Sequence, residues 1–380
     1  MQQKRLLVLA AGILQVPVIK KAKDMGIYVI AADGNRNAEG LKYADKGIVV
    51  NITSEEDVLK VAREERIDGV IHPCSEVAMN VMGRLNDELG LSGITREQAI
   101  RATNKHLMRE AFEKGGAPSP KSVLTKGVED AWTQFQKLDG DGILKPSRNS
   151  GSRGIAKVIK SGRDEENTSK EEFCRLYDVA RNESRDKSVL LEQFIEGPEF
   201  SIEIIVWNGR VNVLTVTDKK TTGAPHFVET GHRQPAPLAP GMFEKIEQTL
   251  YKAFAAMKIE YGAIHPEFRI TKDGKIYFME IATRMGGDCI GTDLTPLSSG
   301  YDFMGMVINI CQGKAPDFTK IREPKLAENH YIMTQADLDE FERVKREEPN
   351  TIWRVSEIKP ISNKPVLKSA DRAGYYITIK

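Results

Sequence analysis

Two glutamates, Glu267 and Glu280, stand where they could bind one metal ion together. Each lies in a stretch of alternating apolar residues, and Asp273-Gly274 between the stretches is typical of a two-residue hairpin turn. Such a turn fixes which residues of the two predicted strands face each other. The expected opposite pairs are Lys272 with Lys275, Ile270 with Tyr277, and Glu267 with Glu280.

Opposed carboxylates need a partner of opposite charge. Directly opposite residues have Cβ atoms about 4.5–5.5 Å apart, and like charges at that spacing destabilise a sheet. A divalent cation removes the repulsion, and magnesium is commonly held by carboxylates together with nucleotide phosphates. The simpler alternative is two solvent-exposed glutamates, and a one-residue change of register would separate them onto opposite faces. We predict that Glu267 and Glu280 bind Mg²⁺, with Mn²⁺ as a second option.

A lysine followed by a loop rich in serine and glycine forms the second pattern. Lys145 ends a predicted strand, and Asn149–Gly154 lies in the loop before the next strand. Glycines let backbone N–H groups approach phosphate oxygens, and the lysine adds a positive charge. The loop is not a P-loop, because it lacks G-K-[ST] and no helix follows. A flexible hairpin tip would have the same composition, so both interpretations stay open.

The edge of a third predicted strand, Glu192–Ile195, could recognise a base. Its backbone offers donor and acceptor groups that can pair with adenine, and Glu199 can accept hydrogen bonds from ribose hydroxyls. A plain strand–turn–strand unit, with Gly197-Pro198 as the turn, explains the same residues.

The first hundred residues are predicted to form a parallel sheet with helices on both faces, because predicted strands and helices alternate there. The strands are expected at Leu6–Ala10, Tyr28–Asp33, Gly47–Val50 and Gly69–His72, and helices at Gln15–Met25 and Ser54–Glu65. Ligands of such sheets bind at the carboxyl ends of the strands. A nicotinamide dinucleotide remains an alternative ligand, although Gly12 alone does not make the three-glycine turn that binds its pyrophosphate.

From Val189 onward, the chain changes to the two-residue periodicity of antiparallel strands. These strands are expected at Leu190–Phe194, Phe200–Trp207, Val211–Thr217, Ala263–Ile270 and Ile276–Ile281. Residues 121–190 hold two short strands, a charged stretch and a helix, which suits a small mobile lid. We therefore expect an α/β and α+β protein with three parts, at residues 1–103, 104–188 and 189–380.

Composition limits the kinds of partner. The 380 residues are 40% hydrophobic and 29% charged with a formal net charge of +1, which gives no electrostatic footprint for nucleic acid. The four cysteines lie far apart, and no apolar run approaches membrane-spanning length. We expect a cytoplasmic protein with small-molecule substrates and with neither nucleic-acid nor membrane partners.

Taken together and in this order, the patterns resemble the ATP-grasp superfamily of carboxylate–amine and carboxylate–thiol ligases. The resemblance covers nearly the whole chain, in the arrangement of biotin carboxylase, carbamoyl-phosphate synthetase and the bacterial L-amino-acid ligases. The segments that carry it are Asn104-Lys105, Lys145-Pro146 with its Ser/Gly loop, Glu192–Ile195 with Glu199, Glu267, and Glu280–Asp288.

The resemblance implies an enzyme that uses ATP and Mg²⁺ to activate a carboxylate as an acyl phosphate. An amine then attacks, and ADP and phosphate are released. The implied fold has an N-terminal pre-ATP-grasp domain, a mobile lid and a C-terminal ATP-grasp domain with an antiparallel sheet. The implied ATP contacts are Lys105 and Lys145 at the phosphates, with Lys145 also near the adenine, Ser150, Gly151, Ser152 and Gly154 in the lid loop, Glu192, Gln193, Phe194 and Ile195 around the adenine, and Glu199 at the ribose.

The resemblance also implies a substrate site. Its residues are Glu229, His232, Arg284 and Gly287 around the amino-acid substrates, with Ser75 and Glu76 as candidate contacts for the acceptor amine. Arg284 would stabilise the acyl phosphate, and Glu229 or His232 could act as general base. One departure concerns the metal, because Ala282 stands where many members have an asparagine ligand.

Three alternatives stay open at this point. The enzyme could act on bicarbonate, or on a purine or amino-sugar precursor, instead of an amino acid. The chain could also be a nucleotide-binding protein without ligase activity, or the nicotinamide-dependent enzyme considered above. The oligomeric state of this protein stays open, although homodimers are usual among the proteins it resembles.

Overall fold

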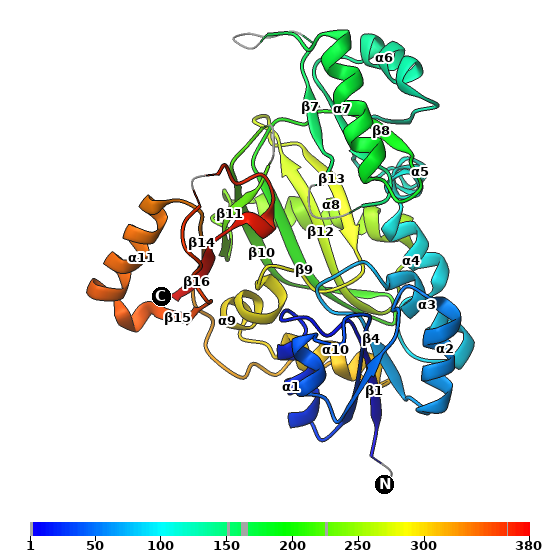
Figure 1. Ribbon diagram of the computed structural model, residues 1–380, viewed down its shortest axis with the longest axis vertical. Helices are drawn as coiled ribbons and strands as arrows, with labels where there is room; N and C mark the ends of the chain where they lie inside the picture. Colours follow the sequence, from blue (N-terminus) through cyan, green and yellow to red (C-terminus); the bar gives the residue numbers. More distant parts are fainter. Residues whose placement is uncertain (1–2, 150–152, 161–165, 225–226, 363) are drawn as a thin grey trace.

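The computed structural model describes residues 3–149, 153–160, 166–224, 227–362 and 364–380. Its described strands form three sheets, of four, eight and four strands. Figure 1 shows the N-terminal sheet at the bottom of the view, the eight-stranded sheet in the middle and the second small sheet at the top. This arrangement confirms the predicted combination of a parallel α/β part with antiparallel sheets.

The N-terminal sheet is parallel, with strand order β3-β2-β1-β4. Its strands are β1 (Arg5–Leu9), β2 (Tyr28–Asp33), β3 (Lys46–Val49) and β4 (Gly69–Ile71), and its helices are α1 (Val16–Asp24), α2 (Glu55–Glu64) and α3 (Met79–Leu89). Strand β1 is apolar from Leu6 to Leu9, because both faces of the sheet are covered. Leu6 and Val8 belong to the core beneath α1, whereas Leu7 and Leu9 belong to the core beneath α2 and α3.

Two helices connect this sheet to the rest of the chain, α4 (Arg96–Thr103) and α5 (Lys105–Gly115). Asn104 caps α5, since its side-chain oxygen accepts hydrogen bonds from the backbone N–H groups of His106 at 3.0 Å and Leu107 at 3.2 Å. The cap fixes Lys105 as the first residue of the helix. Its backbone N–H donates to the carbonyl of Ser147 at 3.0 Å, which ties the helix to the small sheet.

The second small sheet has the order β5-β8-β6-β7 and carries two helices. Its elements are β5 (Ser122–Leu124), α6 (Val128–Lys137), β6 (Gly142–Pro146), β7 (Ala156–Val158), α7 (Lys170–Glu183) and β8 (Val189–Gln193). Phe135 and Phe173 stack in its core with ring centroids 5.3 Å apart. Strand β8 pairs with β5 and β6, so hydrogen bonding places it in this sheet although the predicted division puts it after residue 188.

The eight-stranded sheet has the order β13-β12-β9-β10-β11-β14-β16-β15. Its strands are β9 (Glu199–Trp207), β10 (Arg210–Thr221), β11 (Glu229–Gln234), β12 (Gly262–Ile270), β13 (Ile276–Ala282), β14 (Ala327–Ile332), β15 (Ile352–Val355) and β16 (Gly374–Ile379). Ile202 and Ile204 pack with α5 and α8 (Met242–Met257) on one face. Ile205 and Ala263 pack on the other face with α10 (Phe303–Cys311) and residues of the N-terminal sheet.

Six further helices complete the described chain. They are η1 (Glu39–Lys42), η2 (Ile290–Leu294), α9 (Thr295–Ser299), α11 (Gln335–Glu347), η3 (Pro349–Thr351) and η4 (Ser369–Asp371). Among the residues with described coordinates, none of the helices combines the length and the apolar character that crossing a bilayer requires.

The β12–β13 hairpin confirms one predicted pair and corrects the other two. Glu267 lies opposite Glu280, as predicted, but Ile270 faces Ile276 and not Tyr277. The turn is longer than expected, because the N–H of Thr271 donates to the carbonyl of Lys275 at 2.9 Å and Lys272 falls within the loop. A bulge at Met279 then shifts the register back by one residue. The two irregularities offset each other, so the glutamates meet.

Candidate active site

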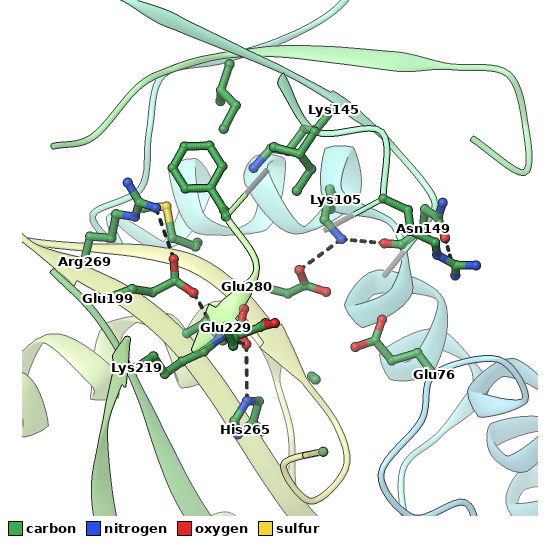
Figure 2. A pocket seen from close by; sticks show the side chains of 18 of the residues that line it. Glu76, Lys105, Lys145, Asn149, Glu199, Lys219, Glu229, His265, Arg269 and Glu280 are labelled. Atoms are coloured by element: carbon green, nitrogen blue, oxygen red, sulfur yellow. Dashed lines mark hydrogen bonds and ion pairs between the residues drawn. The ribbon is translucent and has the colours of Figure 1, made fainter. Parts of the chain in front are cut away.

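A cavity of about 370 Å³ lies where the three sheets meet. The loop after β4 contributes Cys74, Ser75 and Glu76 to its lining. The small sheet contributes Lys145 and the segment Glu192–Ile195, and the eight-stranded sheet contributes the two opposed glutamates. Figure 2 shows Lys105, Lys145, Lys219 and the carboxylates of Glu76, Glu199, Glu229 and Glu280 gathered around this space.

Lys105 joins the glutamate pair to the loop after β6. Its ammonium lies 3.0 Å from Oε2 of Glu280 and donates to the carbonyl of Asn149 at 2.9 Å. Burial raises the pKa of Glu280, and the negative charges of Glu76 and Glu267 add to that effect, while Lys105 opposes it. Lys105 therefore offsets only part of the effect that burial and the neighbouring carboxylates have on Glu280.

Glu267 lies beside two buried basic side chains, Lys219 on β10 and His265 on its own strand β12. Its Oε1 lies 2.6 Å from Nζ of Lys219 and 3.3 Å from Nε2 of His265. Burial alone would raise the pKa of Glu267, but Lys219 and His265 hold that pKa well below its ordinary value. Glu267 is therefore ionised, and its carboxylate could donate an oxygen atom to a metal ion. Lys219 also lies 3.0 Å from Glu199, so one ammonium joins the predicted ribose and metal contacts.

Behind Glu267 runs a chain of buried polar groups. Nδ1 of His265 bonds to Glu203, whose other carboxylate oxygen accepts the backbone N–H of Gly286 at 3.1 Å. A Cβ on Gly286 would lie 2.5 Å from Glu203, so only glycine allows this approach. This series of hydrogen-bonded groups connects the loop after β13 to a predicted metal ligand and fixes the orientation of the imidazole.

Lys145 and Arg109 share one carboxylate at the opposite end of the cavity. Lys145 forms an ion pair with Oε2 of Glu192, and Nε of Arg109 lies 2.8 Å from Oε1. All three side chains are buried, and burial lowers the pKa of Lys145 to about 8. Arg109 also donates to the carbonyl of Met279 at 2.7 Å, so it stabilises the bulge that sets the register of the glutamates.

The predicted adenine and ribose contacts lie together. Phe194 lines the cavity with Arg269 at 5.3 Å and Lys157 at 5.0 Å from its ring centre. Arg269 also donates to Glu199 at 3.2 Å and to the carbonyl of Ile195 at 3.0 Å. A flat aromatic ring flanked by cations can stack on a nucleobase.

At the far end from Lys145, Arg284 pairs with Glu76 at 2.9 Å across the gap between the N-terminal sheet and the loop after β13. Glu229 pairs with Arg372 at 2.7 Å and accepts from Ser369 at 3.2 Å. His232 is buried, and burial lowers its pKa to about 3, so its imidazole is neutral at ordinary pH.

The structure brings together nearly all predicted site residues that it describes. Those lining the cavity are Ser75, Glu76, Lys105, Lys145, Glu192, Gln193, Phe194, Ile195, Glu199, Glu229, His232, Glu267, Glu280, Arg284 and Gly287. Gly154 does not line it and packs against Glu183 and Pro146. Ser150, Gly151 and Ser152 lie outside the described residues.

Sequence reasoning missed Lys219, His265, Arg269, Asp288 and the Arg109–Glu192 pair. His265 stands two residues before Glu267 on the same predicted strand, so the two-residue alternation placed it on the face of Glu267. That signal could have been used. Lys219 is a buried lysine at the end of a strand, and no local pattern distinguishes it from the neighbouring Lys220.

The donor atoms around the two opposed glutamates limit which metal ion could bind there. Over the described parts of the chain, no three His, Cys, Asp or Glu side chains gather as a metal site. Ala282, opposite His265, offers no side-chain oxygen. The Glu267–Glu280 pair fits a magnesium ion that takes its other ligands from phosphates and water, which is how Mg²⁺ usually binds beside nucleotides.

Comparison with known sequences and structures agrees with this geometry. Residues 140–293 match the family described as the ATP-grasp domain.

The individual relatives and solved structures are similar to this chain at sequence identities of 27% or less. The chain is 27% identical over 284 residues to the alanine–anticapsin ligase of Bacillus subtilis, which covers 70% of this chain and 58% of that protein. The crystal structure of the L-amino acid ligase from Bacillus licheniformis superposes with a TM-score of 0.81 at 22% identity, covering 100% of this chain and 94% of that one. The biotin carboxylase domain of the Hydrogenobacter thermophilus 2-oxoglutarate carboxylase, solved with MgADP and bicarbonate, gives 0.75 at 22% identity, covering 100% and 87%. These structures share the fold.

Proposed function

We propose that this protein is an ADP-forming ligase that activates the carboxylate of an amino acid with ATP and joins it to an amine. The observation that carries the proposal is the Glu267–Glu280 pair, with Lys105 on Glu280 and Lys219 on Glu267. Arg284 and Glu76 line the same cavity and supply a cation and a carboxylate for substrate groups. The superfamily and the names of the relatives support a ligase, and the geometry supports ATP and Mg²⁺ as its cofactors.

Charge determines the mechanism that we propose. A carboxylate is a poor electrophile, so its oxygen attacks the γ-phosphate of ATP, and ADP leaves as an acyl phosphate forms. Bound Mg²⁺ would supply neutralisation of the phosphate charge, held by Glu267 and Glu280. Lys105 and Lys145 bind and orient the phosphates, and Arg284 stabilises the acyl phosphate. The lid excludes water until the amine attacks the acyl carbon and phosphate leaves.

Proton removal from the amine is assigned to Glu229 in preference to His232. Burial raises the pKa of Glu229, which makes its carboxylate a better base than an exposed glutamate. The pKa of about 3 leaves His232 a weak base and favours a role in hydrogen bonding to a substrate.

Phosphate release over a panel of substrates tests the proposal. The panel pairs amino acids with amino-acid and amino-sugar acceptors and includes bicarbonate. We expect ATP-dependent release that requires both members of a pair. The Glu280→Ala variant should lose roughly 10²-fold or more of this activity with an unchanged circular dichroism spectrum, whereas Glu196→Ala, an exposed glutamate between β8 and β9, should keep it.

Other outcomes separate the alternatives. Release with bicarbonate alone would favour carboxylation, to which the structural likeness to a biotin carboxylase domain lends support. Tight ATP binding without release for any pair would indicate a nucleotide-binding protein without ligase activity. Unchanged turnover in the Glu280→Ala variant would exclude the metal assignment.

A further inference from the structure

The substrate end of the cavity is completed by a segment that follows the ATP-grasp match by many residues. Helix η4 (Ser369–Asp371) brings Ser369 into the cavity lining, and Arg372 follows directly. In Figure 1 this red segment passes beside β11 and β14. The family match ends at residue 293, so neither Ser369 nor Arg372 lies within it.

Arg372 bridges two carboxylates of the cavity wall. Its Nη2 lies 2.7 Å from Oε2 of Glu229, and its Nη1 lies 2.9 Å from Oδ2 of Asp288. The guanidinium also lies 3.7 Å from the centre of the Tyr331 ring, and the side chain is only 7% exposed. A planar guanidinium can make these contacts at the same time, which the point charge of a lysine cannot do.

The wall that Arg372 holds contains an unfavourable turn. Asp288 and Cys289 have φ values of +51° and +65°, and two successive residues with side chains rarely adopt this left-handed conformation. Surrounding structure must therefore hold the turn in place. The carbonyl of Asp288 accepts from Asn329 at 3.1 Å and from Tyr331 at 3.3 Å, while Arg372 holds its carboxylate.

The same arginine reaches a second predicted substrate contact through Tyr331. The edge of the Tyr331 ring meets His232 with ring centres 5.7 Å apart. His232 is buried, and its Nδ1 has no hydrogen-bond partner within the described chain. A buried imidazole nitrogen without a hydrogen-bond partner is uncommon in folded proteins. Its position depends on the tyrosine that Arg372 covers.

We propose that Arg372 is a positioning residue that clamps Glu229 and the Asp288–Cys289 turn into the wall of the amino-acid subsite. The proposal rests on the function proposed above. It makes the C-terminal segment a determinant of amino-acid binding and leaves nucleotide binding to the other end of the cavity.

Hydrogen exchange tests the clamp without any substrate. The variant is Arg372→Gln, and the matched control is Arg354→Gln. Arg354 comes from the same part of the chain and lies 3.1 Å from the carboxylate of Asp293, a residue that does not line the cavity. We expect amide exchange in residues 284–292 to rise about tenfold or more in Arg372→Gln and to stay near the wild-type rate in the control.

Kinetics supply a readout that general destabilisation would not move selectively. With any substrate pair that releases phosphate, Arg372→Gln should raise the KM for the amino acid about tenfold or more. The KM for ATP should stay within about twofold, because Arg372 does not reach the nucleotide end. Arg372→Lys should raise the KM for the amino acid nearly as much as Arg372→Gln does, because one ammonium cannot bridge both carboxylates.

The two proposals fail separately. If wild-type protein releases no phosphate with any pair, the proposed function is wrong, and exchange in residues 284–292 still decides whether the clamp exists. Wild-type exchange in Arg372→Gln, or an equal rise in the control, would overturn the clamp. A rise in the KM for ATP as large as that for the amino acid would overturn its role in the amino-acid subsite.

Discussion

Lys145 is a residue whose charge depends on pH near the physiological range. Burial lowers its pKa to about 8 from 10.5, so the ammonium of the free protein is lost as pH rises through about 8. The proposed role at the phosphates requires the charged form. We predict that kcat/KM for ATP falls above about pH 8 in the wild type, and that this fall disappears in Lys145→Arg, whose guanidinium stays charged. Initial rates at saturating substrate pair across pH 6–10 measure both profiles.

The same shift makes a prediction for stability. A lowered lysine pKa means that the unfolded chain binds more protons than the folded protein between about pH 8 and 10.5. Lys145 therefore destabilises the fold below that window, and its contribution improves as pH rises through it. Urea denaturation at pH 7.5 and at pH 9.5 gives the change in the free energy of unfolding between these two pH values. This free energy should rise more, or fall less, in the wild type than in Lys145→Met. An identical pH dependence in both proteins would contradict the shift.

Glu203 is a residue without contact to the proposed metal that should nevertheless influence it. It holds His265, which in turn lies 3.3 Å from Glu267. Loss of a residue that orients a ligand typically costs about 10–100-fold in metal affinity or activity. We predict that Glu203→Gln raises the Mg²⁺ concentration for half-maximal phosphate release within that range. Glu328→Gln on β14, whose nearest basic atom in Arg233 is 4.0 Å away, serves as control and should match the wild type.

At the scale of elements, the β12–β13 hairpin and helix α5 depend on each other through Arg109. This buried side chain pairs with Glu192 on β8 and donates a hydrogen bond to the Met279 carbonyl at the bulge. Arg109→Met would leave both groups buried without it. Because Lys145 still pairs with Glu192, we predict a loss of about 1–3 kcal/mol in the free energy of unfolding, measured by urea denaturation. Arg343→Met on α11, which also removes an arginine paired with several glutamates, should change stability little because that surface is exposed.

The hairpin also shows how far the sequence can be read. Apolar alternation on both sides of Asp273-Gly274 identified the strands and the facing glutamates. The type of turn and the bulge were not predictable, because buried Phe268 and Phe278 pack opposite each other and determine the local register. Nonlocal packing of this kind outweighs the preference of the turn residues.

Residues brought in from a distance could not be predicted either. Arg372 reaches Glu229 and Asp288 across separations of 143 and 84 residues. The motifs found in the sequence are local, and they contain most of the predicted side chains that line the cavity. The groups that hold those side chains, such as Lys219 and Arg372, come from other strands, so their positions follow only from the sheet order.

At the scale of the whole molecule, the cavity needs all three sheets. A ligand that contacts all of them stabilises their arrangement, because it binds the folded protein and not the unfolded chain. We predict that ATP with Mg²⁺ raises the unfolding temperature, by the equivalent of about 2.7 kcal/mol at 100 times its Kd. NADH should give no shift, since the buried side chain of Gln15 lies against Gly12 at the only turn that suggested a dinucleotide. A larger shift with NADH would reverse the assignment of the ligand.

The position of β16 has a consequence for the order in which the protein is made. This strand lies between β14 and β15, and Arg372 precedes it by two residues. A ribosome releases the chain from its N-terminus, so the proposed nucleotide contacts emerge before Arg372 does. If the clamp exists, a chain that stops before Arg372 lacks it. Under the proposed function, binding of an amino acid would therefore require synthesis to continue through Arg372.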